Sequence, residues 1–147
     1  MLSATYARDQ NDLITAVLGN DQSAVKTLLE NGADVNAKHS SSATALILAS
    51  QEEYIDIVQV LLTNGADVHA KDNVVGRTAL YLASYSGHID IVNLLLAMGV
   101  SLDEKNNFGQ TAFMAAAQEG HFGIVKYLID EGANPNNKIL MARQPCM

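Results

Sequence analysis

The sequence is short of cysteine, proline and positive charge, and each shortage excludes a class of protein. The one cysteine, Cys146, cannot form a disulfide framework within a single chain, which fits a reducing compartment. Nine Lys and Arg residues against 16 Asp and Glu residues give a net charge of −7, and they form no basic stripe for nucleic-acid phosphates. Two prolines in a chain that is 48% apolar indicate a folded, soluble and mostly helical protein.

Long apolar runs and an N-terminal targeting signal are also missing. No window approaches the roughly 18 uninterrupted apolar residues of a membrane-spanning helix. Residues 1–10 contain no basic region followed by an apolar run, so they do not read as a secretory signal. We therefore expect a cytoplasmic protein that binds neither membrane nor nucleic acid.

What the chain does contain is one pattern written four times. Residues 76–99 read as a helix, a Gly-His turn, a second helix and a glycine stop, and residues 109–132 repeat that order. Weaker copies come earlier, and the stop glycines are 33, 34 and 33 residues apart. The recurring columns are Gly32, Gly65, Gly99 and Gly132; Val25, Val58, Val92 and Val125; and Leu28, Leu61, Leu95 and Leu128. Four copies of one helical pair predict a solenoid, because each unit must bury its apolar face on a neighbour.

The columns also predict the organisation of the unit. Thr44, Thr78 and Thr111 open the first helix of units two to four, and each stop glycine precedes a short polar segment that suits an extended excursion and a turn. One extra residue falls between Lys71 and Gly76, which marks a loop. We expect a single domain over residues 1–147. Its predicted parts are units at about 9–38, 39–71, 72–105 and 106–138, and a C-terminal tail at 139–147.

Several features of the sequence resemble the ankyrin repeat family over residues 9–138. They are the period, the Thr-x-Leu-x-x-Ala first helix, the Gly-His, Ile-Val and Leu-Leu steps, and the Gly-Ala-Asp-Val-Asn-Ala segment. The resemblance implies an all-α solenoid whose units are two antiparallel helices and a projecting β-turn finger. It also implies that the concave groove of fingers and first helices binds partners. The family's signature proline and histidine are replaced here. Ala45, Ala79 and Ala112 stand for the proline, and Ile47, Tyr81 and Met114 stand for the histidine. We therefore expect weaker or more apolar ties between neighbouring loops.

Candidate catalytic and metal-binding residues are few. His88 and His121 occupy one slot in successive units, and stacked helices lie about 8–10 Å apart, too far for two such residues to share one zinc ion. We interpret both as turn residues that cap the second helix. Glu52 and Glu53 read as a solvated turn, and there is no phosphate loop or nucleophile motif. We predict that the protein is not an enzyme and has no cofactor and no metal.

Positions that differ between copies are free of the stacking constraint, and they predict a surface for a protein partner. Aromatic residues and methionine at a surface are typical of interface hot spots. The candidate site residues are Val74, Val75, Arg77, Tyr81, Tyr85, Asn107, Phe108, Gln110 and Gln118. Tyr81, Phe108 and Met114 could instead belong to the stacking core, whereas Val74, Val75 and Tyr85 are expected to be exposed.

The sequence favours a protein–protein interaction module, and two alternatives stay open. One is a dedicated inhibitor or immunity protein that blocks a partner enzyme, since the acidic charge suits a basic target. The other is a self-associating structural repeat. We expect a monomer, with a weak homodimer as the alternative, and the sequence does not identify the partner.

Overall fold

The structure, a computed structural model, describes residues 12–133. Residues 12–18 are helical. The helices that follow are α2 (Gln22–Glu30), α3 (Ala45–Gln51), α4 (Ile55–Thr63), α5 (Ala79–Ser86), α6 (Ile89–Ala97), α7 (Ala112–Gln118) and α8 (Phe122–Asp130). Over this range there is no strand, and one isolated bridge joins Lys38 and Thr44. The predicted all-α fold is confirmed. The tail predicted at 139–147 lies outside the described residues.

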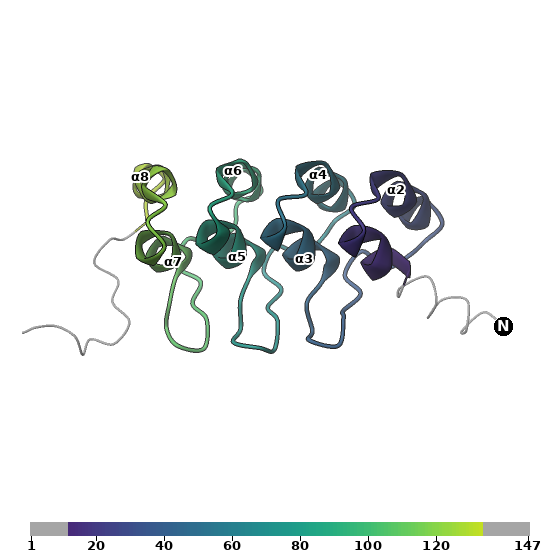
Figure 1. Ribbon diagram of the computed structural model, residues 1–147, viewed down its shortest axis with the longest axis horizontal. Helices are drawn as coiled ribbons and strands as arrows, with labels where there is room; N and C mark the ends of the chain where they lie inside the picture. Colours follow the sequence, from purple (N-terminus) through teal and green to yellow (C-terminus); the bar gives the residue numbers. More distant parts are fainter. Residues whose placement is uncertain (1–11, 134–147) are drawn as a thin grey trace, which may run out of the picture.

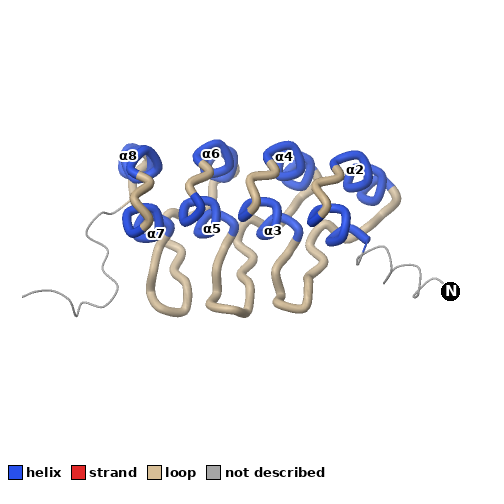
Figure 2. The backbone as a smooth tube through the Cα atoms, in the orientation of Figure 1, coloured by secondary structure: helices blue, strands red, loops and turns tan. Residues whose placement is uncertain are grey.

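The helices form two rows along the long axis of the molecule (Figure 1). The outer row holds α2, α4, α6 and α8, and the inner row holds residues 12–18 with α3, α5 and α7. Between units the chain returns through a long loop that projects below the inner row as a finger (Figure 2). We call these loops finger one (31–44), finger two (64–78) and finger three (98–111). No helix in the described range has both the length and the apolar composition to cross a bilayer.

Each inner helix after finger one begins at a threonine, as predicted. Thr44, Thr78 and Thr111 are the N-caps of α3, α5 and α7, and each Oγ1 accepts a hydrogen bond from the backbone N–H three residues on, at 3.1–3.3 Å. The outer helices end before the predicted stop glycines, whose φ angles are 79° to 107°. Glycine suits that left-handed position because it carries no Cβ.

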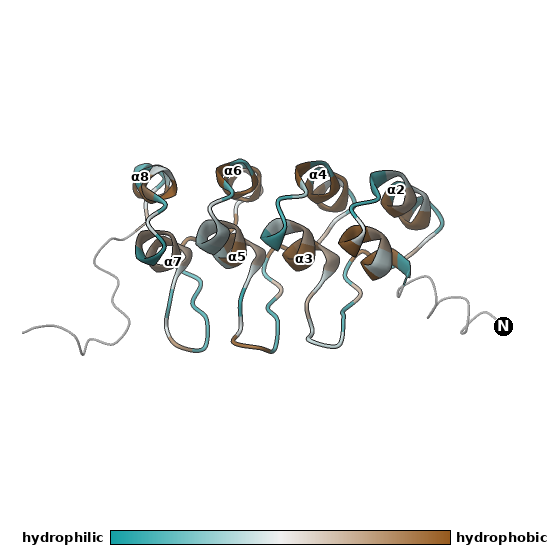
Figure 3. Ribbon diagram, viewed as in Figure 1, coloured by the Kyte–Doolittle hydropathy of each residue, from teal (hydrophilic) through white to brown (hydrophobic). Residues whose placement is uncertain are grey.

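The core lies between the two rows and continues from unit to unit. Figure 3 shows apolar residues on the helices and hydrophilic residues on most of the fingers, with an apolar tip on finger two. Of the recurring leucines, Leu61 and Leu95 are fully buried and Leu128 is 1% exposed, whereas Leu28 is only half-buried. The interior units therefore hold the best-packed copies of the column.

Each finger closes on itself across its tip. The backbone hydrogen bonds run from His39 N to Ala43 O, from Asp72 N to Arg77 O, and from Asn106 N to Gln110 O, at 2.8–3.0 Å. Finger two has one more residue between its paired positions than the other two fingers. The insertion predicted between Lys71 and Gly76 therefore lies at the tip of a finger.

Neighbouring fingers are joined by their backbones. Asn73 N donates to Ser41 O at 2.9 Å, and Asn107 N donates to Val75 O at 2.8 Å. Gly76 has a φ of 74°, which favours glycine, and a Cβ there would lie 2.6 Å from Asn107 Oδ1, so the Asn107 side chain would have to move. The ties between neighbouring loops are therefore backbone hydrogen bonds, and the expectation that these ties are more apolar is wrong here.

Ser42 occupies a position that glycine occupies in the other fingers. Its φ is 61°, against 74° for Gly76 and 77° for Gly109. A residue with a Cβ pays for the left-handed conformation, so Ser42→Gly should raise the free energy of unfolding by about 0.5–1 kcal/mol. The reciprocal Gly109→Ser should lower it by a similar amount. Urea titrations of both variants test this, and a loss of stability in Ser42→Gly would contradict the assignment of strain.

Candidate functional site

A pocket of about 270 Å³ opens where α5 meets fingers two and three. We call it the tyrosine pocket. Its lining residues are Gln51, Val75, Arg77, Tyr81, Leu82, Tyr85, Ser86, Asn106, Phe108 and Gln110. Six of the nine candidate site residues line it, namely Val75, Arg77, Tyr81, Tyr85, Phe108 and Gln110. Because consecutive units stack in register, the fold brings together candidate residues that are up to 35 positions apart in the sequence, Val75 and Gln110.

Two tyrosines from one face of α5 form the wall of the pocket. The rings of Tyr81 and Tyr85 are stacked, with centroids 6.3 Å apart and an interplanar angle of 18°. Tyr81 is 8% exposed, and its hydroxyl donates to Gln110 Oε1 at 3.1 Å. Burial raises the pKa of this hydroxyl; Tyr85 and Glu119 act in the same direction and Arg77 opposes them. Tyr81 is therefore both stacking core and a polar tie to finger three.

Arg77 is held by a buried carboxylate in its own finger. Asp72 Oδ2 lies 2.7 Å from both Nε and Nη2 of Arg77, and Asp72 Oδ1 accepts from Arg77 N at 3.0 Å. Burial by itself raises the pKa of Asp72, but hydrogen bonds from the Arg77 backbone and side chain, and the guanidinium charge, outweigh it and hold that pKa below its usual value. The positive charge of Arg77 is thus compensated inside the protein.

Finger three contains a neutral version of the same arrangement. Asn106 Oδ1 accepts from Phe108 N at 2.9 Å and from Gln110 N at 3.0 Å, and Asn106 Nδ2 donates to Gln110 Oε1 at 2.9 Å. Asn106 was missed among the candidate site residues. The available signal was the Asp or Asn at equivalent positions of two successive fingers, Asp72 and Asn106, a residue type that hydrogen-bonds the backbone two residues on.

The remaining candidate residues surround the pocket or lie away from it. Val74 is 55% exposed at the tip of finger two, and Phe108 and Tyr85 are 62% and 43% exposed at the pocket rim. Val75 is half-buried. Asn107 and Gln118 are exposed and do not line the pocket; Asn107 contributes its backbone to the stacking of the fingers. The expected exposure is confirmed for Val74 and Tyr85 and is wrong for Val75.

His88 and His121 join neighbouring units through their side chains. They occupy the N-cap positions of α6 and α8, so their interpretation as turn residues at the start of the second helix is confirmed, although neither side chain makes a capping hydrogen bond. His88 Nε2 donates to Gln51 O and His121 Nε2 donates to Tyr85 O, each at 3.0 Å. A carbonyl oxygen only accepts, so Nε2 carries the proton in both residues. These bonds fix the last turns of α3 and α5 beside the tyrosine pocket.

The His121 ring packs directly on Gly87, so substitution of this glycine should be costly. Gly87 has a φ of 85°, and a Cβ there would lie 2.7 Å from His121 Cε1. Gly87→Ala should lower the free energy of unfolding by about 1–2 kcal/mol from the backbone alone, with a further loss from the contact. Gly65→Ala is the matched control, because Gly65 has the same φ and no atom within 4 Å of its Cβ.

Thermal melts of Gly87→Ala, His121→Ala and the double variant separate the two contributions. The losses should be less than additive, since the double variant removes the clash. Equal losses of stability in Gly87→Ala and Gly65→Ala would show that the contact with His121 does not destabilise the variant further.

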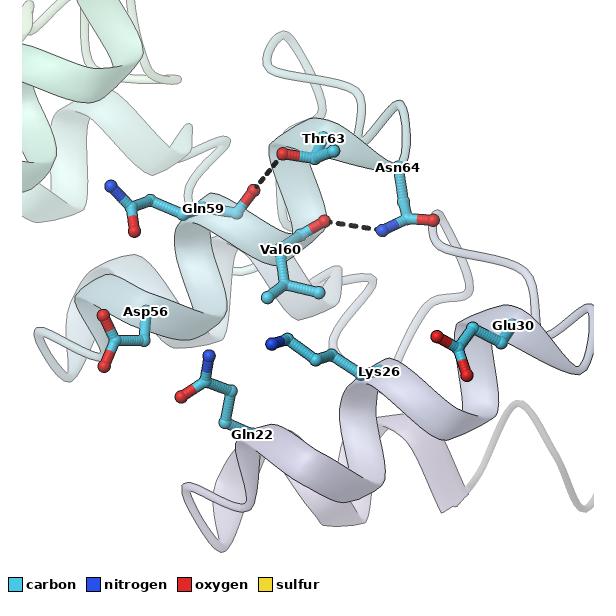
Figure 4. A pocket seen from close by; sticks show the side chains of 8 residues that line it. All are labelled: Gln22, Lys26, Glu30, Asp56, Gln59, Val60, Thr63 and Asn64. Carbon is cyan, nitrogen blue, oxygen red and sulfur yellow. Dashed lines mark hydrogen bonds between the residues drawn. The ribbon is translucent and has the colours of Figure 1, made fainter.

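A second groove lies between the outer helices α2 and α4 and has a different character. It encloses about 510 Å³, and Figure 4 shows Lys26 of α2 extending across it toward α4. The hydrogen bonds there are local: Thr63 Oγ1 donates to Gln59 O, and Asn64 Nδ2 donates to Val60 O. Across residues 12–133 there is no group of three or more His, Cys, Asp or Glu side chains placed to hold a metal ion. This groove contains no convergent chemistry.

Comparison with known families identifies the architecture. A family model described as ankyrin repeats, in three copies, matches residues 3–72 and also residues 46–139. Among curated proteins, no sequence matches the chain. The two matched ranges together extend over nearly the whole sequence, in agreement with the two-row solenoid and its fingers. The chain belongs to the ankyrin repeat family.

Proposed function

We propose that this protein is a non-enzymatic binding module that holds a protein partner against the tyrosine pocket and the adjoining finger tips. Ankyrin repeats are generally protein–protein interaction modules and are typically non-enzymatic. In this proposal residues 1–147 act as one domain, whose units are the four predicted at 9–38, 39–71, 72–105 and 106–138.

The observation that carries the proposal is the exposure of Tyr85 and Phe108 at the rim of a pocket whose lining residues are joined by hydrogen bonds. Tyr85 is stacked on the buried Tyr81, and its carbonyl accepts the bond from His121. Phe108 N is held by Asn106, so the backbone that carries the Phe108 ring is also fixed. A preorganised aromatic pair reduces the entropy lost on binding, which is why such pairs act as hot spots.

The remaining candidate residues support this pair. Val74 and Val75 form the apolar tip of finger two, Gln110 accepts from Tyr81, and Asn107 holds finger three against finger two. Gln118 ends α7 and is exposed on the same inner row. We assign Val74 and Gln118 to the periphery of the contact, where side chains exclude water around the central anchors.

The test is a comparison of partner binding between a pocket variant and a variant altered elsewhere. Tyr85→Ala combined with Phe108→Ala should weaken the complex with the co-purifying host protein about thirtyfold or more, because one hot-spot side chain contributes about 2 kcal/mol. Melting temperature should change little, since both rings are substantially exposed. The measurement is isothermal titration with the purified partner.

The control substitutes exposed apolar residues at the C-cap of α6 and the start of α8, away from the pocket lining. Met98→Ala with Phe122→Ala removes side chains that are 50% and 72% exposed, and it should leave the affinity unchanged. A partner that binds the pocket variant as tightly as the wild type would refute the proposed surface. If the partner is an enzyme that loses its activity in the complex, the protein is a dedicated inhibitor that uses this surface.

A further inference from the structure

Arg77 is the one charged residue that lines the tyrosine pocket, and two carboxylates, Glu52 and Glu119, are the C-caps of the neighbouring inner helices α3 and α7. We propose that the pocket receives a single cationic side chain, an arginine or a lysine, from an extended basic segment of the protein partner. This inference rests on the proposed function and adds the chemistry of the partner to it.

The only cation that lines the pocket is already neutralised. Arg77 is paired with Asp72 at 2.7 Å through two of its nitrogens, and the Asp72 side chain is 2% exposed. A partner carboxylate would have to compete with that buried pair for the guanidinium. Lys71, on the same finger, is paired with Glu104 at 3.1 Å and does not line the pocket. Lys105 directly precedes the lining residue Asn106, is exposed and belongs to no salt bridge among the described residues, so one uncompensated cation remains beside the finger side of the site.

Free carboxylates lie on the helix side of the site. Glu119 is close enough to the Tyr81 hydroxyl to raise its pKa, together with the larger effect of burial. Glu52 directly follows Gln51, which lines the pocket from α3. Neither residue lines the pocket itself, but each is the C-cap of an inner helix that packs on α5, and neither carboxylate has an ion-pair partner in the described part of the chain.

The inner helices add negative potential at the same end. The pocket is lined by Gln51 at the end of α3 and by Tyr85 and Ser86 at the end of α5. A helix C-terminus carries a partial negative charge, and basic side chains usually offset it. α3, α5 and α7 have no basic residue in the last turn, and the only side chains that already bond C-terminal carbonyls of α3 and α5 within residues 12–133 are His88, to Gln51 O, and His121, to Tyr85 O. The overall charge of −7 acts in the same direction and would steer a basic segment toward the protein.

The shape and the rings suit one side chain rather than a small molecule. The volume of about 270 Å³ lies below the range of about 300–1,000 Å³ that is typical for ligand pockets. Tyr85 and Phe108 are both partly exposed at the rim, and aromatic faces attract guanidinium and ammonium groups. A long cationic side chain can lay its methylene groups on these rings while its charged end meets Glu119 or Glu52.

The experiment uses a phage-displayed library of random dodecapeptides, selected on the immobilised full-length protein. Clones that bind the wild type and not Tyr85→Ala with Phe108→Ala should share an arginine or lysine at one position. Replacing that residue by norleucine in the synthetic peptide should weaken binding about tenfold, as expected for loss of a cation–π contact and its charge interactions.

Charge variants separate a specific cation site from general attraction to an acidic protein. Glu52→Gln with Glu119→Gln should weaken the selected peptide about tenfold. Glu30→Gln with Glu131→Gln removes the same number of charges from exposed residues at the ends of α2 and α8, and it should have little effect. Equal weakening by both pairs would overturn the proposed cation site.

The outcomes for the two proposals are distinct. Pocket-dependent clones that share an acidic or purely apolar residue would overturn the cation chemistry and leave the proposed binding surface in place. A host partner that binds equally well when the pocket is substituted would overturn the surface itself, and the cation site with it.

Discussion

Leu95→Ala should lower the free energy of unfolding by about 2–5 kcal/mol, the largest effect of any substitution considered for this protein. Leu95 lies in α6 of the third predicted unit and has no exposed surface. The lost side chain leaves a cavity between the rows, and the helices on either side are themselves fixed by neighbouring units. The site therefore cannot collapse to fill the space.

The repeat provides a matched control for this prediction. Leu28 occupies the equivalent position in the first unit and is half-buried, because no preceding unit covers it within the described residues. Leu28→Ala removes the same atoms and should cost clearly less. Urea titration of both variants gives the comparison. A loss below about 1 kcal/mol for Leu95→Ala would show that Leu95 is not in the core, since fully buried leucines cost more than that.

Asp72→Ala should lower the free energy of unfolding by about 2–3 kcal/mol, because it leaves Arg77 and several backbone N–H groups of finger two without an acceptor. Asp72 Oδ1 accepts from the backbone N–H groups of Val74, Val75 and Arg77 at 3.0–3.4 Å, and Oδ2 holds the guanidinium. The loss should also release the tip of finger two, so partner binding should weaken as well.

Finger three shows how the loss can be recovered. Asp72→Asn combined with Arg77→Gln reproduces the neutral pair that Asn106 and Gln110 form there. This double variant keeps the acceptor for the backbone and leaves no unpaired charge, so most of the stability lost in Asp72→Ala should return. A double variant as unstable as Asp72→Ala would contradict this account of the finger.

The pair also predicts a pH dependence. The pKa of Asp72 is lowered in the folded protein, so its stabilising contribution is present above the unfolded value of about 3.9 and is lost as the pH falls through the lower folded value. The double variant cannot lose this contribution. The stability difference between wild type and double variant should therefore shift in favour of the double variant below about pH 4, measured by urea titration across that range. A difference that stays constant would exclude Asp72 as the cause.

The repeat made the fold readable from the sequence. In each recurring column the same local requirement appears several times. Examples are the threonine N-cap at Thr78 and the left-handed glycine at Gly99. Agreement between the copies therefore outweighs the ambiguity of one short helix. The same alignment placed the extra residue of finger two in a loop. The alignment of the copies also identified most of the pocket residues, because positions that differ between copies are those free of the stacking constraint.

Contacts that cross between units were not readable in this way. His88 and His121 share a slot with the cap of the outer helix, but their acceptors are carbonyls 37 and 36 residues earlier, in the preceding unit. Arg77 reads as a free surface cation, and only the folded finger places it against Asp72. Tyr81 reads equally as core or as surface, and the stacking of finger three on finger two makes it both.

The sequence by itself determined the repeat, its helices and stops, and the set of positions free to vary, because these depend on local conformational preference and apolar spacing. Only the tertiary structure decided which polar groups of neighbouring units come together, because a hydrogen bond between units forms only where donor and acceptor lie within about 3.2 Å and are well aligned. Those contacts between units leave the tyrosine pocket with exposed rings and a neutralised arginine, and they leave unpaired carboxylates beside it.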